Sequence, residues 1–214
     1  MNLTYDPAKA TAHLLNADPS LARVVEQVGP LEIRHGGRPY EALVRSILYQ
    51  QLAGPAAAAI ERRFLALYGD DGRVPTPEQM LATSVETFRT AGVSRQKAGY
   101  LLDLAAKTHE GVVGDHLVEM PDEEVATHVM AVKGIGRWTA DMLLIFSLGR
   151  PDILPVGDLG LRNAVKRLYN HPEHLPPKEL EALAEPWRPF RSAATWYLWQ
   201  WLDVRLPDAA PVEG

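Results

Sequence analysis

The spacing of apolar residues in this 214-residue chain indicates one helix after another and almost no strand. Only Leu31–Gly37 has strand character, and it is too short to build a sheet. The pattern therefore predicts an all-α fold. The expected helices are Tyr40–Gln51, Ala56–Tyr68, two short helices beginning at Pro77 and Ser84, Ser94–His109 with Ser94 as N-cap, 122–132, Arg137–Leu148, Asp158–Tyr169, Lys178–Ala184 and Arg188–Val204.

The composition removes several classes of protein. Without any cysteine, the chain forms no disulfide, no cysteine-ligated zinc site, no iron–sulfur cluster and no cysteine nucleophile. Its most apolar run, Met142–Leu148, is far shorter than the roughly 20 residues of a membrane helix. No signal peptide is recognisable at the N-terminus. We therefore expect a soluble protein of the cytoplasm, associated with the nucleoid in a bacterium.

The distribution of charge is uneven. The net charge of −5 argues mildly against a nucleic-acid partner, because many nucleic-acid-binding domains are strongly basic. Residues 133–167, however, contain six Lys and Arg against three Asp, a local balance of +3. Glu123 and Glu124, just before this segment, resemble solvated surface charges. A local surplus of positive charge is compatible with binding phosphate.

The segment Lys133-Gly134-Ile135-Gly136 separates two helical patterns by only four residues. Two glycines at this spacing permit a tight turn and leave the start of the next helix uncovered, where free N–H groups bind anions. Ile135 should point inward between the two helices, and Thr139 could add a hydroxyl contact. The alternative is a plain helical hairpin with a glycine turn.

Asp158 follows a Pro-Val-Gly turn and stands at the start of an expected helix. An aspartate there commonly serves as an N-cap. The same position favours an ionised carboxylate, which can stabilise a developing oxocarbenium ion or orient a water molecule. The residues leave both roles open.

Three motifs occur in order: KGIGRWTA, LPVGDLGLR and EPWRPFRSAATWYLW. Together they resemble the helix-hairpin-helix DNA glycosylase superfamily, in particular its 3-methyladenine DNA glycosylase II (AlkA-type) branch. The resemblance extends from about Tyr40 to Asp203. It implies two helical lobes with a cleft between them: residues 40–149, including a helix-hairpin-helix at 122–148, and residues 1–39 plus 150–214. The chain before Tyr40 is too short for the mixed α/β domain of some relatives.

The resemblance also implies an activity. Asp158 matches the catalytic aspartate, and Trp138 stands where bifunctional members have a lysine. This implies a monofunctional enzyme that excises alkylated bases of the 3-methyladenine and 7-methylguanine type by base flipping and hydrolysis of the N-glycosidic bond, in base excision repair. Two alternatives remain: specificity for deaminated or oxidised bases, and a non-catalytic DNA-binding module.

The resemblance further implies binding residues. In the hairpin, DNA contacts are expected at Gly134, Gly136, Arg137 and Thr139. Gln51 matches the residue that fills the gap left by a flipped base, with Leu52 beside it and Gln50 in support, although these residues could simply end a helix. The expected base pocket contains Trp199, Trp138, Met142 and Leu159, although tryptophans on a helix are more often core.

The expected partners and cofactors are few. The resemblance implies duplex DNA containing damaged bases as partner, no membrane, and a monomer. No cofactor is required and no iron–sulfur cluster is expected. A structural Na⁺ or K⁺ could bind the backbone carbonyls of Met130, Val132 and Gly134.

Overall fold

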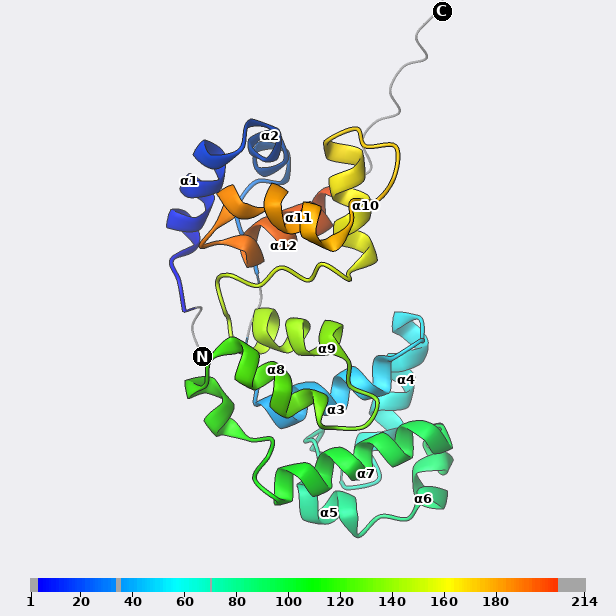
Figure 1. Ribbon diagram of the computed structural model, residues 1–214. Coiled ribbons are helices and arrows are strands. Elements are labelled where there is room, and N and C mark those ends of the chain that lie inside the picture. The colour runs from blue at the N-terminus through cyan, green and yellow to red at the C-terminus, as the bar shows by residue number, and fades with distance from the viewer. Residues whose placement is uncertain (1–3, 34–35, 70, 204–214) are drawn as a thin grey trace, which may run out of the picture. The chain divides into compact units, whose positions relative to one another are not determined.

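Every regular element in the described part of the chain is a helix, which confirms the all-α prediction (Figure 1). The computed structural model describes residues 4–33, 36–69 and 71–203. The described residues of Leu31–Gly37 form no strand. None of the described helices combines the length and apolar character that crossing a membrane requires.

The described residues form two compact units. One unit comprises residues 36–148 and the other comprises residues 4–33 and 149–203. We refer to them as unit 1 and unit 2.

Unit 1 is built around α7. The core of this unit includes Leu43 and Ile47 of α3, Phe64 of α4, and Leu101 and Leu104 of α7, none more than 1% exposed. Helix α7 packs against α3, α5 and α6. The elements of unit 1 are α3 (Pro39–Tyr49), α4 (Gly54–Leu65), α5 (Pro77–Leu81), α6 (Val85–Thr90), α7 (Arg95–His109), the 3₁₀ helix η1 (Asp115–Glu119), α8 (Asp122–Met130), α9 (Arg137–Met142) and the π-helix η2 (Leu143–Ser147).

Three helices of unit 1 begin directly after a capping residue, and Ser94 is the N-cap that the sequence predicts. The side chains of Thr76, Ser84 and Ser94 each accept a hydrogen bond from a backbone N–H in the first turn of the helix that follows. Pro77 is the first residue of α5. The expected helix Arg137–Leu148 has the right extent but not a uniform geometry, because its second half is a π-helix in which the Leu148 N–H donates to the Leu143 carbonyl.

Unit 2 is built around α12, whose residues are buried on nearly every side. Ala193, Ala194, Tyr197 and Leu198 are fully buried. Helix α12 packs against α1, α2 and α10. The elements of unit 2 are α1 (Pro7–Ala17), α2 (Pro19–Val28), α10 (Leu159–Leu168), α11 (Pro177–Leu183), the 3₁₀ helix η3 (Glu185–Trp187) and α12 (Arg191–Asp203).

Helices α1 and α2 are not among the helices expected from apolar spacing. Their signal lies in two Asp-Pro pairs instead. Asp6 and Asp18 are N-caps, and Pro7 and Pro19 occupy the first helical positions, where the missing N–H of proline costs nothing. An aspartate followed by proline therefore marks both helix starts.

Candidate functional site

Asp158 is the N-cap of α10, and its carboxylate is held from two directions. Oδ1 accepts the backbone N–H of Leu161 at 2.6 Å and the indole N–H of Trp199 at 2.8 Å. The first bond confirms the capping role. The second joins the start of α10 to α12, 41 residues further along the chain. Because both donors are fixed in helices, the carboxylate is oriented before any ligand arrives.

Gly160, which sequence reasoning missed, leaves room for this arrangement. A Cβ at this position would lie 3.1 Å from Oδ1 of Asp158 and 3.1 Å from Cδ1 of Trp199. Glycine therefore allows the indole to reach the carboxylate. The signal was present in the motif Asp158-Leu-Gly. Leu159 itself is 61% exposed, so its side chain contributes little to the core of unit 2.

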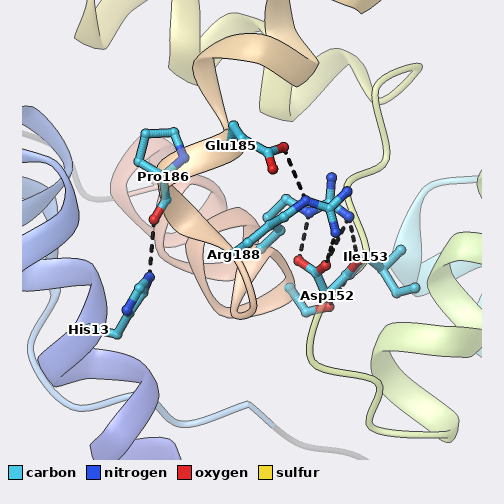
Figure 2. Close-up of polar contacts among 8 residues, drawn as sticks. His13, Asp152, Ile153, Glu185, Pro186 and Arg188 are labelled. Carbon is cyan, nitrogen blue, oxygen red and sulfur yellow. Dashed lines mark hydrogen bonds and ion pairs between the residues drawn. The ribbon is translucent and has the colours of Figure 1, made fainter.

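The loop that leads to Asp158 is anchored to the start of α12. Figure 2 shows Asp152 facing Arg188, which also binds Glu185. Asp152 accepts a further hydrogen bond from Nε of Arg191 at 2.6 Å. The hydroxyl of Ser192 accepts the N–H of Ile153 at 3.0 Å. These contacts tie the loop to the helix that carries Trp199.

The hairpin turn requires glycine at only one of its two glycine positions. Gly134 has φ +79°, and a Cβ there would lie 2.3 Å from ring carbons of Tyr100. Gly136 has φ −106°, and a Cβ there would have no atom within 4 Å. The fold therefore explains Gly134 but not Gly136. Ile135 between them is 7% exposed, as expected of a residue that joins α8 to α9.

Arg137 pairs with two carboxylates, although its side chain is 51% exposed. Its guanidinium binds both carboxylate oxygens of Glu123 at 2.8 Å and Oδ1 of the buried Asp141 at 2.8 Å. Glu123 is therefore not merely a solvated charge. Thr139, another expected DNA contact, is 6% exposed. A role of the Arg137 side chain at phosphate would compete with two existing ion pairs.

The surplus of positive charge counted over residues 133–167 is partly neutralised in the folded protein by carboxylates from outside that segment. Lys133 donates its backbone N–H to Asp103 at 2.8 Å, and its Nζ lies 3.2 Å from the same carboxylate. Asp103 and Glu123 both lie outside the counted segment. A count along the sequence misses such partners.

Replacing Arg137 by methionine should destabilise the protein by about 2 kcal/mol, because the buried Asp141 loses its charge partner. Burial raises the pKa of Asp141, and Arg137 opposes that rise. The variant should therefore have a higher Asp141 pKa than wild type. Its loss of unfolding free energy should shrink as the pH falls through that pKa, because the folded variant then takes up a proton at Asp141. Urea unfolding over a pH series measures the deficit. The double variant with Asp141→Leu should recover most of it, and failure to recover would disprove the assignment.

An open pocket of about 1090 Å³ lies within unit 1 and brings several expected residues together. Trp138, 49% exposed, lines it with Met142 and Thr139 of the same helix. Gln50 and Gln51 line it from the turn after α3. Trp199, Asp158 and Leu159 belong to unit 2. The expected site residues therefore form two groups, one in each unit.

The turn between α3 and α4 contains the residues expected to fill the gap that a flipped base leaves in the duplex. Gln51 has φ +57° and its side chain is exposed; the exposed fraction of Leu52 is 39%. Nε2 of Gln50 donates to the Gly134 carbonyl at 2.9 Å. The Gln50 side chain thus binds the hairpin rather than a carbonyl of its own helix.

Two of the three carbonyls expected to hold a monovalent cation accept hydrogen bonds in this structure. The Val132 carbonyl accepts the Ile135 N–H at 3.1 Å and the Gly134 carbonyl accepts Gln50. Each carbonyl has a second lone pair, and oxygen donors suit hard cations. The site stays a prediction. The described residues contain no group of three or more His, Asp or Glu placed to hold a metal.

Comparisons with known proteins agree with this geometry. Residues 44–189 match the family model described as HhH-GPD superfamily base excision DNA repair protein. The chain is 38% identical over 199 residues to DNA-3-methyladenine glycosylase 1 of Schizosaccharomyces pombe, with 90% of this chain and 86% of the relative covered. It is 33% identical to the alkylbase DNA glycosidase-like protein mag2 of the same organism, with 94% and 96% covered.

Solved structures agree as well. A 3-methyladenine DNA glycosylase of S. pombe in complex with abasic DNA superposes with a TM-score of 0.80 at 36% identity, covering 90% of this chain and 95% of that one. A DNA-3-methyladenine glycosidase from Bacillus halodurans gives 0.79 at 33% identity, covering 93% and 90%. With its hairpin, its capped aspartate and more than half its length matched, this chain belongs to the HhH-GPD superfamily of base excision DNA repair proteins.

Proposed function

We propose that this protein is a monofunctional DNA glycosylase that removes alkylated bases of the 3-methyladenine and 7-methylguanine type from duplex DNA, acting as a monomer in base excision repair. The observation that carries the proposal is the Asp158 carboxylate, fixed by the Leu161 N–H and the Trp199 indole. A DNA-binding module without chemistry would need only a helix cap at this position, which a neutral serine or asparagine also supplies, whereas a carboxylate there repels phosphate. The relatives named as alkylbase glycosylases support the same conclusion.

The proposed reaction is hydrolysis of the bond between C1′ and the base nitrogen. The bonding electrons leave with the base, and positive charge develops at C1′ and the ring oxygen. Asp158 stabilises that charge electrostatically. Water then adds to C1′ and loses a proton, which leaves an abasic site. An alkylated purine that carries positive charge is already a good leaving group, so moderate assistance is sufficient.

Trp199 is proposed to recognise the base. An indole face attracts a cationic ring, and the hydrogen bond from Nε1 to Asp158 fixes the orientation of the ring. Trp138, Met142 and Leu159 are proposed as further apolar contacts of the base. Bifunctional relatives have a lysine at the position of Trp138, so no amine is expected there to form a Schiff base with the sugar.

The DNA backbone is proposed to bind at the hairpin. Gly136 leaves the N–H groups at the start of α9 uncovered by any side chain, and Thr139 lies in the first turn. A monovalent cation on the carbonyls of Met130, Val132 and Gly134 would add positive charge beside a phosphate. Gln51, with Leu52 beside it, is proposed to occupy the gap left by the flipped nucleotide.

The purified protein should be incubated with duplexes that contain one defined lesion each: 7-methylguanine, hypoxanthine or 8-oxoguanine. We expect alkali-labile sites only, with the cationic 7-methylguanine processed fastest because of the contact with Trp199. Strand breaks before alkali, or a covalent adduct trapped by borohydride, would refute monofunctional chemistry. Faster release of a neutral base would favour the alternative specificity. No release of any base would refute the glycosylase proposal.

A further inference from the structure

The turn that carries Gln51 has the backbone of a type II β-turn with glutamine where glycine is favoured. Gln50 has φ −51° and ψ 130°, Gln51 has φ +57°, and the Leu52 N–H donates to the Tyr49 carbonyl at 3.3 Å. The third position of such a turn needs a positive φ, which glycine or asparagine adopts most readily. A glutamine held there is strained, so the surrounding structure must fix it.

Three side-chain hydrogen bonds connect this turn and the residue before it to other elements of unit 1. Nζ of Lys97 in α7 donates to the Leu48 carbonyl at 2.7 Å, immediately before the turn. The phenol of Tyr49 donates to Glu61 of α4 at 2.7 Å. At the second turn position, Gln50 binds the Gly134 carbonyl of the hairpin. The turn is thus connected to both neighbouring helices and to the expected phosphate-binding loop.

Lys97 occupies a position that its own helix does not favour. It lies in the first turn of α7, where the helix dipole disfavours a positive charge. Burial lowers the pKa of its amine, which shows that the ammonium is partly removed from water. The hydrogen bond to the carboxyl end of α3 offsets this cost. The helix dipole favours a cation there, and the last carbonyls of the helix lack helical partners. The placement of Lys97 therefore serves the end of α3, next to the turn.

We propose that Lys97 and the Tyr49–Glu61 pair are positioning residues that hold the 49–52 turn in its strained form, so that Gln51 is ready to enter the duplex when a nucleotide leaves. The proposal rests on the proposed function. It adds that insertion is prepared in the free protein, and that Gln50 couples the turn to the hairpin that binds DNA.

The experiment compares single-turnover excision of 7-methylguanine from two duplexes. In one, the lesion is paired with cytosine, and in the other it faces an abasic-site analogue, so that less pairing must be broken. Lys97→Met and Tyr49→Phe should each lower the rate on the paired duplex about tenfold and the rate on the unpaired duplex much less. The fluorescence of 2-aminopurine next to the lesion should rise less with the variants than with wild type, because the base flips less often.

Lys107→Met is the matched control. It removes a lysine from the same helix whose Nζ binds Glu110, so both rates should equal those of wild type. An equal loss on both duplexes would reduce Lys97 and Tyr49 to structural residues, and unchanged rates on both would also overturn the proposal. Thermal unfolding identifies a variant that fails to fold. If Lys97→Met does not fold, the rates of Tyr49→Phe, which loses only one hydroxyl, test the proposal. Absence of excision by wild type would refute the proposed function instead, while the fluorescence would still report on the turn.

Discussion

Asp158→Asn should lower the single-turnover rate of base excision by about 10³-fold while the protein remains folded. The amide oxygen of asparagine can still accept the N–H groups of Leu161 and Trp199, so the cap and the orientation of the side chain are retained. Only the negative charge is lost, and with it the stabilisation of the sugar cation. Gel analysis after alkali treatment measures the rate, and calorimetry measures the stability.

Two further variants separate charge from geometry at this site. Asp158→Ala also removes the cap, so it should lose about 1 kcal/mol of stability in addition to activity. Gly160→Ala keeps the charge but places a Cβ 3.1 Å from Asp158 and Trp199, so its activity should lie between those of wild type and Asp158→Asn. If Asp158→Asn excises bases at the wild-type rate, the carboxylate is only a cap and the proposed mechanism is wrong.

Gly134→Ala should destabilise the protein by about 3 kcal/mol, the largest loss of stability that we expect from any single methyl group here. The alanine would have to adopt φ +79°, and its Cβ would overlap the ring of Tyr100, 2.3 Å away. Either the turn must shift or the Tyr100 side chain must leave its position. Denaturant unfolding measures the change, and fluorescence anisotropy with a labelled duplex measures DNA binding, which should weaken as well.

Gly136→Ala provides the contrast two residues later. Its φ of −106° suits alanine, and no atom lies within 4 Å of the added methyl group, so stability should change by less than about 1 kcal/mol. Binding of duplex DNA should nevertheless weaken about tenfold, because the methyl group would stand where a phosphate approaches the N–H groups. Unchanged affinity would show that DNA does not bind at this helix start.

Local signals in the sequence are sufficient to predict most helices and the capping position of Asp158. Ser84, Ser94 and Asp158 cap helices through hydrogen bonds that span three residues, so a reader of the sequence can find them. The helices after Asp6 and Asp18 have equally clear caps, which apolar spacing alone does not reveal. The π-helix that follows Met142 has no such local signature.

Contacts between distant residues could not be predicted in this way. Nothing in the spacing of Asp158 and Trp199 indicates that they share a hydrogen bond. The resemblance implies that Arg137 contacts DNA, and nothing in the sequence indicates that Glu123, 14 residues earlier, is its carboxylate partner across the hairpin. The cleft expected between the lobes stays a prediction.

The glutamine at position 51 implies that selection for stability and selection for repair activity favour different residues at this position. Selection for stability alone would favour asparagine or glycine there, since both accept a positive φ with little strain. Selection for repair would retain a side chain long enough to reach between bases. In a mutational library, the substitutions at position 51 that raise thermal stability should therefore be among those that lower repair activity most.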